Sequence, residues 1–246
     1  MEFVTAYVLL VIFIATLIRS AFGFGEALFA VPLLAFRLPL TVATPLAVLI
    51  SITIAGVVVV QDWQKIHWRS AGWLLTATLF GTPLGLLLLT SRHQGALKLT
   101  LGLFLIGFSV YCLRRRTKLP QLKSDSRAWL LGCGLFAGVL GGAYGMNGPP
   151  LVIYGTMRNW TPQHFRATLQ GYFLPASVVG MLGYWLRGLW VPAVTHYYLE
   201  SLPVMLPAIF AGRIVNHSLH GRSFVSAVYV CLAGIGAALL MQSTMT

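Results

Sequence analysis

The sequence has little charge and very little acid. Only 9% of its 246 residues are charged, against about 25% in ordinary soluble domains, and only five are Asp or Glu. Mean hydropathy is +0.80, and several runs approach the roughly 20 apolar residues that cross a bilayer. The longest polar interval, Arg114 to Arg127, is too short to be a folded module. This composition excludes a soluble domain and predicts an all-α polytopic membrane protein.

The sequence also lacks the motifs of metal, redox and nucleotide chemistry. Its three cysteines, Cys112, Cys133 and Cys231, stand in apolar segments without CxxC spacing. Neither a zinc-binding HExxH pattern nor a phosphate-binding P-loop occurs, and Ser20 has no matched base for nucleophilic catalysis. We therefore expect no metal, no cofactor and no enzymatic activity.

Basic residues are concentrated in one place. Of the seventeen Lys and Arg, six lie between Arg114 and Arg127. Loops with such an excess face the cytoplasm, so we interpret this one as a topology determinant rather than as a nucleic-acid site. Binding of anionic lipid headgroups by the same loop is a second interpretation.

Ten apolar segments divide into five and five around the basic loop, and the two halves resemble each other. Ala21-Phe22-Gly23 matches Ala143-Tyr144-Gly145 at an offset of 122 residues, and Ala43-Thr44 matches Ala167-Thr168 at 124. Gly56 and Gly85 match Gly183 and Gly212 at 127. We infer a duplication with a first repeat at 1–113, a basic loop at 114–127 and a second repeat at 128–246.

The run from Phe3 to Phe36 measures roughly 50 Å if helical, too long for one span and too short for two. Two short helices meeting at a break fit this length. A broken hairpin followed by three spans in each half makes the repeats inverted. With the basic loop inside, this topology places thirteen of seventeen Lys and Arg in the cytoplasm, the seven beyond the loop being Arg19, Lys65, Arg69, Arg158, Arg166, Arg213 and Arg222.

A parallel four-plus-four arrangement with eight spans leaves only nine of these basic residues inside, so the charge rule favours inversion. Both termini are then expected outside, in a multi-pass protein of the bacterial inner membrane.

The two breaks are the candidate binding site. Irregular backbone at membrane depth is tolerated only where it packs in protein or lines a cavity, and inverted-repeat transporters bind anions at half-helix N-termini. Gly23, Gly25, Gly145 and Gly148 let the backbone unwind, and Pro149-Pro150 suit a helix restart. The alternative is that these glycines only allow close helix packing.

Several side chains near the breaks could act on a ligand or be structural. Asn147 and Tyr144 could bind an anion or cap a half-helix; Thr44 and Thr168 could bond their own helix backbone instead. Arg166 could reach an anion or extend to the headgroups. The substrate-binding candidates are Gly23, Phe24, Gly25, Thr44, Tyr144, Gly145, Met146, Asn147, Gly148, Arg166 and Thr168.

Glu26 is the candidate for proton coupling, because an ionisable residue inside a membrane is a functional hypothesis by default. The alternatives are a neutral, hydrogen-bonded glutamic acid or a carboxylate paired with Arg19.

The stretches "GFGEALFAVPLL" and "GGAYGMNGPPLVIYGTMRNWTPQHFRATLQGYF", each early in its half, resemble the paired signatures of the TauE/SafE sulfite exporter family, also called the TSUP permeases. The resemblance implies transport of sulfite, sulfonates such as sulfoacetate, or related organic acids. It places the family's glycine-rich motifs on Gly23, Gly25, Gly145 and Gly148. Glu26 and Asn147 depart from the family's run of glycines, and a carboxylate beside an anion is unfavourable unless it is protonated.

The sequence therefore predicts a secondary transporter of a small sulfur-containing or organic anion, with proton coupling. An anion channel and an intramembrane enzyme remain as alternatives. Expected partners are the anion, protons and membrane lipids, with no nucleic acid; a homodimer is left open.

Overall fold

The computed structural model describes residues 2–62, 68–91, 93–114, 127–158, 162–218 and 222–244, and within them the chain forms helices and no strands. The helices are α1 (Glu2–Phe22), α2 (Glu26–Leu34), α3 (Leu40–Asp62), α4 (Trp68–Leu89), α5 (Gln94–Arg114), α6 (Arg127–Tyr144), α7 (Gly148–Met157), α8 (Pro162–Leu186), α9 (Pro192–Ser218) and α10 (Arg222–Thr244).

Four of the described helices are long and apolar enough to cross a membrane, over Phe3–Ala21, Leu40–Val57, Ala71–Leu89 and Gln94–Arg114. Large apolar side chains such as Phe80, Phe136 and Trp185 are exposed on the outside, as expected where lipid replaces water. The protein is an all-α polytopic membrane protein. The expectation of two short helices before the first full span is wrong for α1, whose 21 residues reach about 30 Å.

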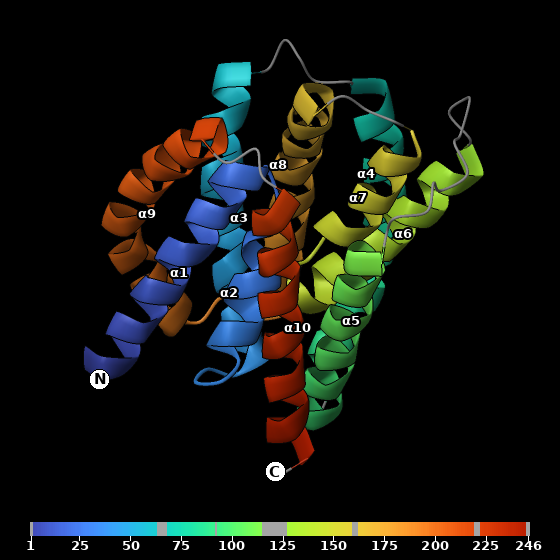
Figure 1. The fold of residues 1–246 in the computed structure, drawn as a ribbon. Coiled ribbons are helices and arrows are strands. Elements are labelled where there is room, and N and C mark those ends of the chain that lie inside the picture. Colours follow the sequence, from blue (N-terminus) through green and yellow to red (C-terminus); the bar gives the residue numbers. More distant parts are fainter. Residues whose placement is uncertain are drawn as a thin grey trace.

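The second half of the chain repeats the first in the opposite direction. In Figure 1, α5 runs from the bottom of the view to the top, whereas α10 runs from the top to the bottom, and both chain ends lie at the bottom. The packing is exchanged in the same way: α4 packs on α6 as α9 packs on α1, while α3 packs on α8 and α5 on α10. This is the arrangement that two inverted five-helix repeats produce.

Equivalent residues of the two halves have equivalent neighbours. A methyl group added at Gly85 would lie 2.9 Å from the Cα of Gly142, and one added at Gly212 would lie 2.5 Å from the Cβ of Ser20. Gly85 and Gly212 are matched in the sequence, and Ser20 and Gly142 are 122 residues apart, the offset found for the two breaks. Of the proposed boundary loop, 114–127, only the two end residues are described, Arg114 at the end of α5 and Arg127 at the start of α6.

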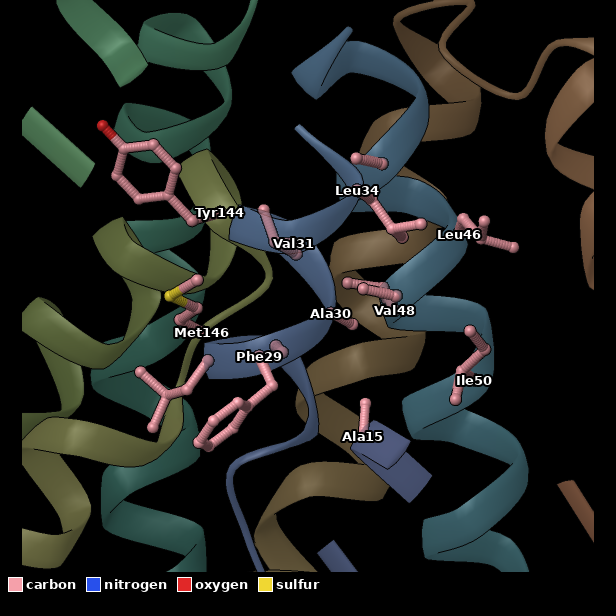
Figure 2. Close-up of a cluster of buried hydrophobic side chains, with 14 of the residues drawn as sticks. Ala15, Phe29, Ala30, Val31, Leu34, Leu46, Val48, Ile50, Tyr144 and Met146 are labelled. Atoms are coloured by element: carbon pink, nitrogen blue, oxygen red, sulfur yellow. The ribbon is translucent and has the colours of Figure 1, made fainter. Parts of the chain in front are cut away.

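The short helix α2 lies at the centre of the larger apolar core. Eight of its nine residues are buried, as expected for a helix that is hydrophobic on all sides. Figure 2 shows Phe29 and Val31 of α2 with Met146 of the second break, and all three belong to one cluster of buried side chains. The core therefore fixes the first broken helix against the second.

Arg19 does not lie in a loop, contrary to the charge count made from the sequence. It is in the last turn of α1 and its relative exposure is 0%. Arg19 therefore does not indicate which side of the membrane a loop faces. Its charge must be balanced inside the protein.

Candidate functional site

Both broken helices end with the same backbone turn. Gly23 has φ 83° and Gly145 has φ 67°, the left-handed conformation that glycine adopts without a steric penalty just after a helix. The Gly23 N–H donates to Arg19 O at 2.6 Å, and the Gly145 N–H donates to Gly141 O at 2.8 Å. The matched glycines thus terminate α1 and α6 in equivalent ways.

The chain then restarts as a helix within a few residues. Gly25 precedes α2 with φ 105° and provides no side-chain cap, and α7 begins at Gly148 with Pro149 and Pro150 in its first turn. The first N–H groups of a helix have no partner within it and carry the positive end of its dipole. Two such ends therefore lie at the breaks.

One small cavity lies between these two helix starts. Its volume is about 10 Å³, which is room for about one water molecule, and its walls come from both repeats. The lining residues are Gly25, Glu26, Ala27, Leu28, Ser51, Gly145, Met146, Asn147, Gly148, Pro149 and Phe173.

A buried ion pair lies beside the cavity, and one of its members, Glu26, lines it. Nη1 of Arg19, at the end of α1, pairs with Oε1 of Glu26, at the start of α2, and the two side chains are 0% and 7% exposed. Each charge also lies at the helix end whose dipole favours it. The pair therefore bridges the first break and closes it.

Polar side chains from two other helices also hold the guanidinium of Arg19. Nη1 donates to Ser51 Oγ of α3 at 2.7 Å, and Nη2 donates to Gln170 Oε1 of α8 at 2.8 Å. Its guanidinium carbon lies 5.0 Å from the centre of the Phe173 ring, within the range of a cation–π contact. The arginine is held from both repeats.

Gln170 also fixes the break itself. Its Nε2 donates to the Gly23 carbonyl at 2.6 Å, so one side chain of the second repeat holds both the turn and the arginine of the first. Ser177 of α8 donates to Ser51 at 3.2 Å, which joins α8 to α3 beside the cavity.

The comparisons with known proteins decide the family. The family model described as "Sulfite exporter TauE/SafE" matches residues 8–239. The chain belongs to the TauE/SafE family. It is also 25% identical over 233 residues, covering 93% of this chain and 90% of the relative, to the "Probable sulfite/organosulfonate exporter TauE" of Cupriavidus necator. No solved structure matches the chain.

Membership in the TauE/SafE family supports a membrane transporter and agrees with the expectation that the chain is not an enzyme. The structure brings together many of the residues that the sequence singled out. Gly25, Glu26, Gly145, Met146, Asn147 and Gly148 line the cavity between the breaks. Phe24 lies beside it, with its Cδ2 3.5 Å from the position of a Cβ at Gly148.

Asn147, where the TauE/SafE resemblance implied a glycine, fills space left by another glycine. Its side chain lies against Gly141, where any Cβ would collide with it. Its Oδ1 is buried without a hydrogen-bond partner among the described residues. Asn147 therefore presents an unused acceptor at the second break.

The remaining candidates lie farther from the cavity. Thr44 is buried against Gly145, with Cγ2 3.6 Å from the position of a Cβ there, and Thr168 is buried in α8. The Tyr144 hydroxyl turns toward α5, where it donates to Leu97 O at 3.1 Å and lies 2.6 Å from Thr100 Oγ1 (Figure 2). The Arg166 side chain lies outside the described residues.

The sequence predicts no site role for Ser51, Gln170 or Phe173, and the role it offers Arg19 at the site is that of an alternative partner for Glu26. The available signal was the spacing of Arg19 and Glu26, seven residues apart across a glycine-rich break, in a chain with five acidic residues.

Proposed function

We propose that the protein is a secondary transporter that moves a small anion across the bacterial inner membrane. The candidate substrates are sulfur-containing or organic acids such as sulfite, a sulfonate or sulfoacetate, which agrees with the name of the relative from Cupriavidus necator. The observation that carries the proposal is the cavity lined by both helix breaks.

The electrostatics of the cavity support an anion as the substrate. The N-termini of α2 and α7 both border it, and such ends attract negative charge through unpaired N–H groups and the helix dipole. The guanidinium of Arg19 lies behind Ser51 and Phe173, where it is paired with Glu26.

The small volume of the cavity supports a carrier rather than an open pore. A space of about 10 Å³ holds about one water molecule and is smaller than any of the proposed anions. Binding therefore requires the two breaks to move apart, as in transporters whose inverted repeats rock around a central site. Glu26 lines the cavity and is the proposed proton-coupling residue.

The experiment is uptake into proteoliposomes that contain the purified protein. A panel of sulfite, short sulfonates, sulfoacetate, thiosulfate and short carboxylates is tested at increasing concentration. We expect saturable uptake of at least one of these anions, faster than into protein-free liposomes. Flux that rises without saturation would indicate a channel, and no uptake of any anion would contradict the proposal.

A further inference from the structure

The contacts of Arg19 extend the proposed function, on which this inference rests. We propose that the guanidinium of Arg19 binds the substrate anion, and that the carboxylate of Glu26 takes the place of the anion in the empty protein. Each singly charged anion then enters with one proton, and transport is electroneutral.

The Glu26 carboxylate and a substrate anion would compete for the same nitrogen of Arg19. Nη1 of Arg19 holds both the Glu26 carboxylate and Ser51 Oγ, and Glu26 and Ser51 both line the cavity. A carboxylate and a sulfonate are alike in charge and in their hydrogen-bond acceptors. The carboxylate of Glu26 therefore stands where the substrate anion would pair with the guanidinium.

Two contacts of Arg19 remain when Glu26 leaves. Nη2 stays bonded to Gln170 of α8, and the Phe173 ring stays beside the guanidinium. Neither contact depends on α2. Arg19 can therefore exchange one carboxylate for another anion without losing its attachment to the second repeat.

The buried charges of the site must balance in both the empty and the loaded protein. The empty site holds Arg19 and Glu26, with a net charge of zero. An anion paired with Arg19 beside an ionised Glu26 would leave one unpaired buried negative charge, which is strongly unfavourable away from water. A proton bound to the Glu26 carboxylate removes that charge, so the loaded site is neutral as well.

Other groups that could titrate in place of Glu26 would lie on the helices packed on α2. Of the helices packed on α2, α1 supplies Arg19, and the Tyr7 hydroxyl of α1 donates to Leu33 O near the far end of α2. On α3, Ser51 does not titrate in this range. On the described parts of α5 and α10 the other titratable groups are Lys98, Tyr111, Cys112, Arg114, Tyr229 and Cys231, and none of these residues lines the cavity beside Glu26.

The same balance selects the charge of the substrate. One carboxylate can take up one proton, so a doubly charged anion would still leave one unpaired negative charge in the loaded site. We expect singly charged sulfonates, hydrogensulfite or monocarboxylates to be preferred to dianions, which places sulfoacetate among the poorer substrates.

The test uses ethanesulfonate, which stays ionised from neutral to mildly acidic pH, and ethane-1,2-disulfonate as the matched dianion. Uptake into proteoliposomes is measured with a pH gradient or a membrane potential imposed separately. In the wild type we expect the rate of uptake to depend on the pH gradient and not on the membrane potential. Uptake of the monoanion should be at least about tenfold faster than uptake of the dianion. Uptake that follows the potential and ignores the pH gradient would overturn the inference, and so would equal transport of the dianion.

Variants of the pair give a second readout. In the Glu26→Gln variant the empty site carries the positive charge of Arg19 alone. Uptake is therefore expected to lose its dependence on the pH gradient and to become dependent on membrane potential. In the double variant Arg19→Gln, Glu26→Gln, uptake is expected to fall at least about tenfold. Glu200→Gln is the matched control, because Glu200 pairs with His196 on the exposed part of α9; its uptake should equal that of the wild type.

The outcomes separate the two proposals. No uptake of any anion by the wild type would refute transport itself. Uptake that is electrogenic in the wild type, or unchanged in the double variant, would leave a transporter in which the Arg19–Glu26 pair is only structural. The wild-type measurements decide the inference even where a variant fails to fold.

Discussion

Arg19 and Glu26 hold each other inside the protein. Each is buried, and each has partners that satisfy part of its charge. A buried ion pair adds little when compared with well-packed apolar residues, but removal of one partner leaves an uncompensated charge. The pair should therefore behave as a unit in measurements of stability.

We expect Arg19→Gln and Glu26→Gln each to lower the free energy of unfolding by about 3–5 kcal/mol. The double variant should lose less than the sum of the two, because no lone charge remains. Denaturant unfolding in detergent measures all three. Losses that simply add would show that the two side chains do not interact.

Substitution of Gly145 tests whether the turn at the second break needs a glycine. Alanine at Gly145 would adopt a left-handed conformation that costs roughly 1–2 kcal/mol, and its Cβ would lie 3.0 Å from Val48 Cγ2. Gly188→Ala is the matched control, since its φ is +69° and no atom lies within 4 Å. We expect similar backbone strain in both variants but slower uptake only for Gly145→Ala. Equal uptake by the two would argue against a site at the second break.

At the scale of helices, small residues bring α4 and α6 close together. A methyl group at Gly138 would lie 2.5 Å from Thr78 O and 2.9 Å from Gly81 Cα, and one at Gly134 would lie 2.6 Å from Leu74 O. Such contacts let helix backbones approach where no hydrophobic effect drives association. Because α6 leads directly into the second break, this packing also positions the cavity.

Gly138→Ala should therefore destabilise the protein by roughly 1–3 kcal/mol through overpacking. Gly132→Ala lies on the same helix with no atom within 4 Å, and it should be neutral or stabilising by up to about 1 kcal/mol. The two variants are compared by their thermal unfolding in detergent. If Gly138→Ala is as stable as Gly132→Ala, the close approach of α4 and α6 is not required.

The sequence predicted both breaks because a cluster of glycines inside an apolar run weakens a membrane helix at that point. It was wrong about Arg19, which it counted among the cytoplasmic basic residues and which is instead buried in α1 against Glu26, Ser51 and Gln170. Ser51 and Gln170 carry no local signal of their role. Their contacts depend on the crossing of α3 and α8, which a single sequence does not specify.

For the whole molecule, the opposed directions of α5 and α10 agree with the inverted repeats inferred from loop charge. The side on which each end lies stays a prediction. We expect reporters fused at either terminus to report the outside and a reporter inserted in the basic loop to report the cytoplasm. Termini that report the cytoplasm would contradict this topology.

The charged pair has no counterpart in the other half of the chain. At the offset of the two breaks, Arg19 corresponds to Gly141 and Glu26 to Gly148. In a symmetric inverted repeat, exchanging the conformations of the halves gives two states of equal energy, one open to each side. Here the exchange moves the ion pair into a different environment, so the two states differ in energy. We therefore expect the empty carrier to rest facing one side of the membrane, with an apparent affinity for the anion that differs between the two faces.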